Sequence, residues 1–248
     1  MSGHSKWASI KHKKAAADAQ KGRVFTKIIK ELTQAAREGG GNSDANPRLR
    51  VALEKAKESN MPKENITQAI KRGTGELPGV VYESVTYEGY GSGGVAILVE
   101  ALTDNKNRAA AEIRNLFSKR NGNMGTPGSV AWMFHQKGLI LVDKKVNEDT
   151  LMTLALESGA EDFKSDDPEN YEITTAPSDF EKVRQVLDSK GIQPKHAELA
   201  MVPANTVKVE GSTARQALAL VQALEDHDDV QNVYANFDIP EEILKQEE

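Results

Sequence analysis

The side chains best suited to binding chemistry in this chain are the lysines and arginines near its N-terminus. Residues 1–75 contain 16 Lys and Arg against 7 Asp and Glu, a balance of 16 − 7 = +9. The rest of the chain contains 32 − 16 = 16 basic and 37 − 7 = 30 acidic residues, a balance of −14. This asymmetry indicates a basic segment that meets a polyanion, because lysine and arginine neutralise phosphates and release their counterions. The simpler alternative is a solvated helical surface that happens to be basic.

We predict nucleic-acid contacts at basic, histidine and tryptophan side chains of this region. Residues 1–22 contain few large apolar side chains, so we expect a loose arm or a marginal helix that orders on a partner. Trp7 lies among the lysines of this arm and could either stack on a nucleobase or pack onto the following helices as an anchor. The predicted contact residues are His4, Lys6, Trp7, Lys11, His12, Lys13, Lys14, Lys21, Arg23, Lys27, Arg48, Arg50, Lys71 and Arg72.

No motif in the chain supports catalysis, a metal site or a cofactor. The absence of cysteine excludes disulfides, thiolate zinc sites and cysteine nucleophiles. Residues 89–94 satisfy the pattern G-x-G-x-x-G, but a dinucleotide site needs a helix after the glycines, and we predict a hairpin between two strands. The five histidines lack the spacing of metal ligands or of a serine-based catalytic set, and the acids of residues 225–229 are expected to be solvated. We therefore expect a non-enzymatic protein without metal or cofactor.

The chain shows no signal for a membrane or for secretion. No run approaches the roughly 18 apolar residues that a membrane helix needs. No apolar segment follows the early lysines, as it would in a secretory signal. We therefore expect a cytoplasmic protein with no membrane partner, and we favour a monomer.

The first third of the chain has the periodicity of short amphipathic helices. Residues 23–38 carry apolar side chains at the i, i+3, i+4 spacing, and three glycines follow. Asn46-Pro47 predicts a cap and first helical position for a second helix, and Met61-Pro62 starts a third that Gly73 should stop. We expect a small all-α domain over residues 1–78.

The remaining residues alternate between strand and helix patterns. Strands are predicted at 80–89, 95–102, 129–136, 139–143, 161–165, 170–176, 196–202 and 230–237. Helices are predicted at 107–120, 147–158, 178–190 and 213–224, and residues 121–128 should form a turn. The order from 137 to 204 is βαββαβ, a split βαβ (ferredoxin-like) arrangement. We therefore expect an α+β multidomain fold in which this unit is inserted into a discontinuous α/β domain of residues 79–136 and 205–240.

The N-terminal motif resembles that of the YebC/PmpR family, which includes a mitochondrial translational activator of cytochrome c oxidase. The similarity extends over essentially the whole chain and includes residues 2–7, 10–14, 21–27, 46–50, 60–62, 70–73, 87–91, 103–108, 128–134 and 224–231. The resemblance implies a helical first domain plus two α/β domains, one inserted in the other. It carries over the basic residues of the opening motif as nucleic-acid contacts, and it implies no catalytic residues.

Three functions remain to be compared at this stage. The resemblance favours a DNA-binding transcriptional regulator, although the helices show no evident helix-turn-helix recognition pattern. The alternative is a factor that binds ribosomal RNA or the ribosome and relieves stalling at proline-rich stretches, since a basic arm with a tryptophan suits irregular RNA. An enzyme with a site between the α/β domains is the third possibility, and no motif supports it.

Overall fold

The structure is a computed structural model, and it describes residues 18–245. It divides into two compact units, each described here by itself. The larger unit comprises residues 18–129 and 211–233, and the smaller unit comprises residues 130–210 and 234–245. Helices precede two four-stranded sheets, so the fold is the mixed helix-and-sheet class predicted from the sequence. Within the described residues, no helix has both the length and the apolar character needed to cross a membrane.

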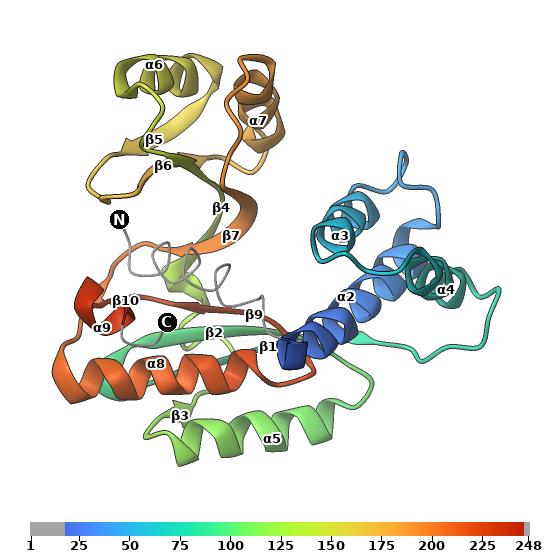
Figure 1. The fold of residues 1–248 in the computed structure, drawn as a ribbon. Coiled ribbons are helices and arrows are strands. Elements are labelled where there is room, and N and C mark those ends of the chain that lie inside the picture. The colour runs from blue at the N-terminus through green and yellow to red at the C-terminus, as the bar shows by residue number, and fades with distance from the viewer. Residues whose placement is uncertain (1–17, 246–248) are drawn as a thin grey trace. The chain divides into compact units, whose positions relative to one another are not determined.

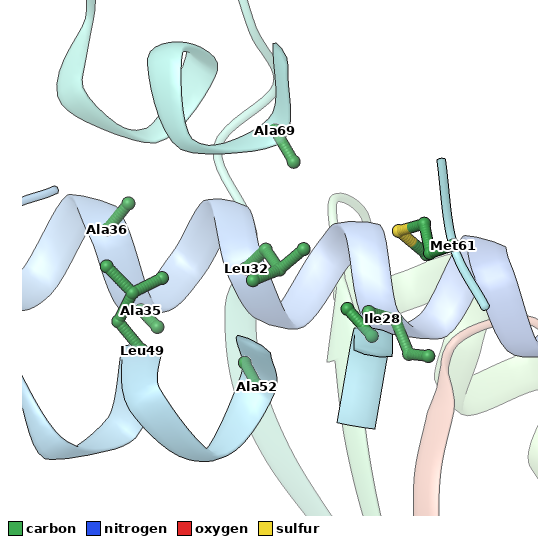
Figure 2. Packing of buried hydrophobic residues seen from close by; sticks show 9 residues of the cluster. Ile28, Leu32, Ala35, Ala36, Leu49, Ala52, Met61 and Ala69 are labelled. Carbon is green, nitrogen blue, oxygen red and sulfur yellow. The ribbon is translucent and has the colours of Figure 1, made fainter. Parts of the chain in front are cut away.

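The larger unit begins with three helices around a small core, α2 (Asp18–Gly39), α3 (Pro47–Glu58) and α4 (Lys63–Thr74). α2 packs against both of the other helices, and Figure 2 shows the buried side chains, among them Leu32 and Leu49, along its length. The predicted cap at Asn46 is confirmed: its Oδ1 accepts the Leu49 N–H at 3.0 Å. The Asn46 amide also donates to the carbonyl oxygens of Ala35 and Gly40, so it ties α3 to the end of α2.

The structure differs from the predictions for these helices at two points. The first helix begins at Asp18 rather than at residue 23, which agrees with the helical alternative for the last residues of the arm. The third helix passes through Gly73 and ends at Thr74, and the cap that follows is Gly75, whose φ of 85° is left-handed. Gly73 serves packing instead, since a Cβ there would lie 2.3 Å from the Thr33 carbonyl oxygen of α2. A glycine at a close helix crossing and a glycine that stops a helix look alike in sequence.

The larger unit continues with a sheet whose strand order is β3-β1-β2-β9. The glycine-rich stretch forms a hairpin, as predicted, between two of its strands, with Tyr90 opposite Ala96. Helices α5 and α8 pack against each other, and both lie along the sheet (Figure 1). The elements are β1 (Glu83–Tyr90), β2 (Ala96–Thr103), α5 (Lys106–Lys119), β3 (Asn123–Met124), α8 (Gly211–Glu225) and β9 (Val230–Ala235).

Residues 121–128 were predicted to form a turn, but this stretch also contains the short strand β3. This short strand pairs with β1, with Met124 opposite Gly89 and Asn123 opposite Tyr90. A Cβ on Gly89 would lie 2.6 Å from the Asn123 carbonyl oxygen, so that glycine allows the two strands to approach. Two residues are too few to give a strand pattern in sequence.

The smaller unit is a sheet of order β5-β6-β4-β7 whose helices α6 and α7 cover one common core. Its element order from residue 134 is βαββαβ, in agreement with the predicted order. A two-stranded parallel ladder and a short helix complete the unit. The elements are β4 (Phe134–Asp143), α6 (Glu148–Ser158), β5 (Ala160–Lys164), β6 (Asn170–Thr175), α7 (Phe180–Ser189), β7 (His196–Pro203), β8 (Val207–Lys208), β10 (Phe237–Asp238) and α9 (Glu241–Lys245).

Two strand predictions in this part of the chain were wrong. The strands expected at 129–136 and 139–143 are one strand, β4, which passes through Gly138. A Cβ at Gly138 would lie 2.2 Å from the Thr175 Oγ1, so this glycine permits close packing rather than a turn. The strand expected at 230–237 is divided into β9 and β10, which belong to different sheets.

Candidate nucleic-acid interface

One face of α2 carries three basic side chains, Arg23, Lys27 and Lys30. Their spacing of four and three residues places them on one side of the helix. All three contact the acidic segment, defined here as residues 225–229, which joins α8 to β9. Figure 1 shows the first turns of α2 beside the end of α8. Two of these residues, Arg23 and Lys27, are among the predicted nucleic-acid contacts.

The contacts run along the helix face in order. The Arg23 guanidinium lies 2.6 Å from the Asp226 carboxylate. The Lys27 ammonium donates to the Glu225 carbonyl oxygen at 2.5 Å. Further along, the Lys30 ammonium donates to the Asp228 carbonyl oxygen at 3.0 Å and to Asp229 Oδ1 at 2.5 Å. The basic face of α2 therefore has an intramolecular anionic partner.

Asp229 is the centre of a buried network. Its side chain is 4% exposed, and its Oδ2 accepts hydrogen bonds from Arg108 at 2.8 Å and from Thr103 at 2.9 Å. Burial raises the pKa of Asp229, but the hydrogen bonds from Lys30, Arg108 and Thr103 outweigh burial and hold the pKa at about 2. The expectation that residues 225–229 are solvated acids was therefore wrong for Asp229.

His227 lies beside Asp229 in this region. Its Nδ1 accepts the Asp229 backbone N–H at 3.1 Å, and its Nε2 lies 2.9 Å from a Glu112 carboxylate oxygen. The ligand atoms of Glu112, His227 and Asp229 lie within 4.8 Å of one another, which is close enough to consider a metal ion. However, Asp229 already binds Lys30 and Arg108, and a cation at this position would have to displace them.

The predicted contacts on α3 also have intramolecular partners. Arg48 forms ion pairs with Glu31 at 2.7 Å and with Glu38 at 2.5 Å, which join α3 to α2. The hydrogen bond to Glu31 raises the pKa of Arg48, so it stays charged. Arg50 donates to the carbonyl oxygens of Ser43 and Asp44 in the preceding loop. Both arginines hold the helices and the loop together, and their role in nucleic-acid binding stays a prediction.

Besides Arg23 and Arg37 on α2, the helical part has exposed basic groups on α3 and α4. Lys71 is exposed and Arg72 is half-buried, both in the last turn of α4. Sequence reasoning missed three exposed lysines near the turn between these helices, which form no ion pair within residues 18–245: Lys55, Lys57 and Lys63. The helical periodicity of the sequence places these lysines on the solvent side of the predicted helices, and this signal could have identified them as exposed. Glu54, Glu58 and Glu64 alternate with them, so the positive charge near this turn is local rather than continuous.

The remaining predicted contacts belong to the arm. Lys21 lies in the first turn of α2. The others lie outside the described residues: His4, Lys6, Trp7, Lys11, His12, Lys13 and Lys14. Nucleic-acid binding at these positions stays a prediction, as it does at Arg23, Lys27, Arg48, Arg50, Lys71 and Arg72.

Comparison with known proteins defines the family. Residues 5–76 match the family described as "TACO1/YebC protein N-terminal domain", and residues 82–237 match "TACO1/YebC second and third domain". The chain belongs to the TACO1/YebC family. Relatives in this family include a protein of Dictyoglomus turgidum, 58% identical over 99% of both chains. Another, from Sulfurihydrogenibium sp., is 60% identical over 99% of this chain and 98% of its own.

The TACO1/YebC relatives from both organisms are named "Probable transcriptional regulatory protein". A solved structure is also similar: the crystal structure of a conserved hypothetical protein from Aquifex aeolicus has a TM-score of 0.85 and 48% identity. The match covers 96% of this chain and 99% of that one. The TACO1/YebC fold therefore extends over nearly the full length of the sequence.

Proposed function

We propose that this TACO1/YebC protein is a non-enzymatic transcriptional regulator that binds duplex DNA, with residues 1–78 as its nucleic-acid-binding domain. The observation that carries the proposal is the balance of +9 over residues 1–75 in a chain that is otherwise acidic. The names of the relatives from Dictyoglomus turgidum and Sulfurihydrogenibium support the regulatory role. We further propose that it acts in the cytoplasm as a monomer.

The described helices suggest how such a domain would work. Arg48 and Asn46 hold α3 on α2, so these helices form a fixed unit that follows the arm in the sequence. Lys71 and Arg72 add positive charge on α4. Phosphate contacts of this kind position a protein on nucleic acid without reading its sequence. The acidic remainder repels the polyanion, and this repulsion should orient the docked protein.

Salt dependence tests the proposed contacts directly. Replacing Lys11, Lys13 and Lys14 together by alanine should weaken DNA binding and flatten the dependence of log K on log salt by about 2–3 units, since each lost phosphate contact removes about 0.9. Fluorescence anisotropy of a labelled DNA duplex over a range of salt concentrations measures this slope. An unchanged slope would show that the arm makes no phosphate contacts.

A matched control removes the same charge from elsewhere. The control variant replaces three exposed lysines outside the predicted interface, Lys119, Lys182 and Lys190. It should bind DNA with the slope of the unaltered protein. An equal loss in both variants would mean that net charge alone governs binding.

The nature of the target needs a measurement in cells. Crosslinking followed by sequencing of the bound nucleic acid should give fragments concentrated at discrete promoters. Fragments concentrated in one region of ribosomal RNA would overturn the transcriptional proposal. They would support the alternative, a ribosome-associated translation factor.

A further inference from the structure

We propose that the acidic segment 225–229 is a built-in competitor of nucleic acid, which occupies the basic face of α2 and keeps Arg23 and Lys27 from phosphates until a nucleic acid displaces it. The inference rests on the proposed function and concerns the regulation of the same interface. Its basis is the set of contacts between α2 and the end of α8, which links residues about 200 positions apart in the chain.

The segment presents the chemistry that phosphates present. Four of its five residues are acidic. It begins at the C-terminal end of α8, where unpaired helix carbonyl groups add partial negative charge. Lys27 donates to one such carbonyl oxygen, that of Glu225, and Arg23 pairs with the Asp226 carboxylate. Arg23 thus binds a carboxylate as it would bind a phosphate, and Lys27 donates to a carbonyl oxygen that carries partial negative charge.

The contacts differ sharply in exposure along α2. Lys30 and Asp229 have side chains only 11% and 4% exposed. Arg23 and Asp226 have side chains 48% and 60% exposed, at nearly the same ion-pair distance. Exposed pairs are weak and are screened by salt, whereas a buried pair is costly to break. Lys30 therefore serves as a fixed anchor, while the Arg23 end of the contact can open.

Of the three basic residues on this face of α2, Arg23 is also the one that lies closest in the chain to the basic arm. A nucleic acid on the arm would bring a high density of phosphate charge, one per about 1.7 Å of duplex, toward the first turns of α2. Asp226, a single carboxylate, competes poorly for Arg23 with that density of phosphate charge. A nucleic acid that binds tightly would displace the acidic segment and add Arg23 and Lys27 to the interface. A nucleic acid that binds weakly would leave the acidic segment on α2.

The decisive variant is Asp226→Asn, which removes the competing charge and keeps the side-chain shape. We expect it to bind a short fluorescein-labelled DNA duplex of random sequence about two- to fivefold more tightly at low salt, the range that an exposed ion pair is worth. The salt slope should steepen by about 0.9, because Arg23 gains a phosphate contact. The matched control is Glu83→Gln, which removes one exposed acid from another ion pair of the same unit.

The same titrations separate failure of this inference from failure of the proposed function. If the unaltered protein binds the duplex and Asp226→Asn binds no more tightly than Glu83→Gln, the segment is a structural contact only, and the inference is overturned. If neither the unaltered protein nor its variants bind DNA or a ribosomal RNA fragment, the proposed function and this inference are both refuted. A second variant, Arg23→Ala, tests whether Arg23 is the group that Asp226→Asn releases. In that background Asp226→Asn should give no gain beyond that of Glu83→Gln, and a persistent gain would exclude Arg23 as the group released.

Discussion

Replacing Asp229 by asparagine should strongly destabilise the larger unit. The substitution keeps the size of the side chain but removes the charge that faces Lys30 and Arg108. The Lys30 ammonium would remain nearly buried, with a side chain 11% exposed and no counterion. Breaking a buried pair in this way costs about 3–5 kcal/mol of unfolding free energy. Because total stability is typically about 5–15 kcal/mol, the loss should be readily measured.

An exposed pair of the same unit supplies the control. Lys106 and Glu83 approach to 2.6 Å, close to the 2.5 Å of the buried pair, but their side chains are 53% and 58% exposed. Glu83→Gln should therefore cost at most about 1 kcal/mol. Urea unfolding followed by far-UV circular dichroism gives both free energies. Hydrogen exchange should place the loss of protection in α2 and at the start of β9.

The pH dependence of stability gives a second test of the same pair. The pKa of Asp229 is about 2 in the folded protein, against 3.8 ordinarily. A folded-state pKa that is lowered contributes stability above the unfolded pKa, here about 2.5 kcal/mol, and the contribution is lost as pH falls from about 4 toward 2. This figure is smaller than that for the substitution, because both oxygens of a protonated carboxyl group can still accept hydrogen bonds, whereas the amide nitrogen of asparagine can only donate. Asp229→Asn should lack this portion of the acid sensitivity.

Two results would refute this reasoning. One is a free energy of unfolding for Asp229→Asn within about 1 kcal/mol of that for Glu83→Gln, since burial would then add nothing to the pair. The other is an acid-unfolding curve below pH 4 that keeps the same shape in both variants. Either result would mean that water reaches Lys30 and Asp229 in solution.

Two further pairs of substitutions, each a variant with its control, test helix packing and capping by urea unfolding. Gly73→Ala should cost about 1–3 kcal/mol, because its methyl group would meet the Thr33 carbonyl oxygen, whereas Gly22→Ala, with no atom within 4 Å, should gain about 0.5–1 kcal/mol. Equal effects at the two glycines would contradict the close crossing of α2 and α4. Asn46→Ala should cost about 2–3 kcal/mol, since it removes a helix cap and two further hydrogen bonds, while Asn147→Ala, an exposed cap, should cost about 1 kcal/mol. Similar losses at the two caps would show that the added bonds of Asn46 contribute nothing.

The secondary structure followed from the sequence where the signal was local. Apolar residues at i, i+3 and i+4 predicted the helices, and Asn46-Pro47 predicted the start of α3 correctly. The βαββαβ order was also correct, because each strand carries its own pattern. Two errors fell on glycines, since Gly73 and Gly138 lie where neighbouring elements approach closely rather than where the chain turns. The division of residues 230–237 between two sheets and the burial of Asp229 depend on tertiary contacts.

What the sequence determined by itself was the family, the element order and the concentration of positive charge in residues 1–75. The tertiary structure decided which of those charges have partners inside the protein. Lys30 and Asp229 are 199 residues apart, and their burial together makes one basic residue of the region an anchor. Lys71 carries the same charge as Lys30 but is exposed. The periodicity of a helix or strand is set by residues that are neighbours in the sequence. An ion pair such as that of Lys30 and Asp229 depends on which distant parts of the chain fold against each other, and neither composition nor local pattern specifies that.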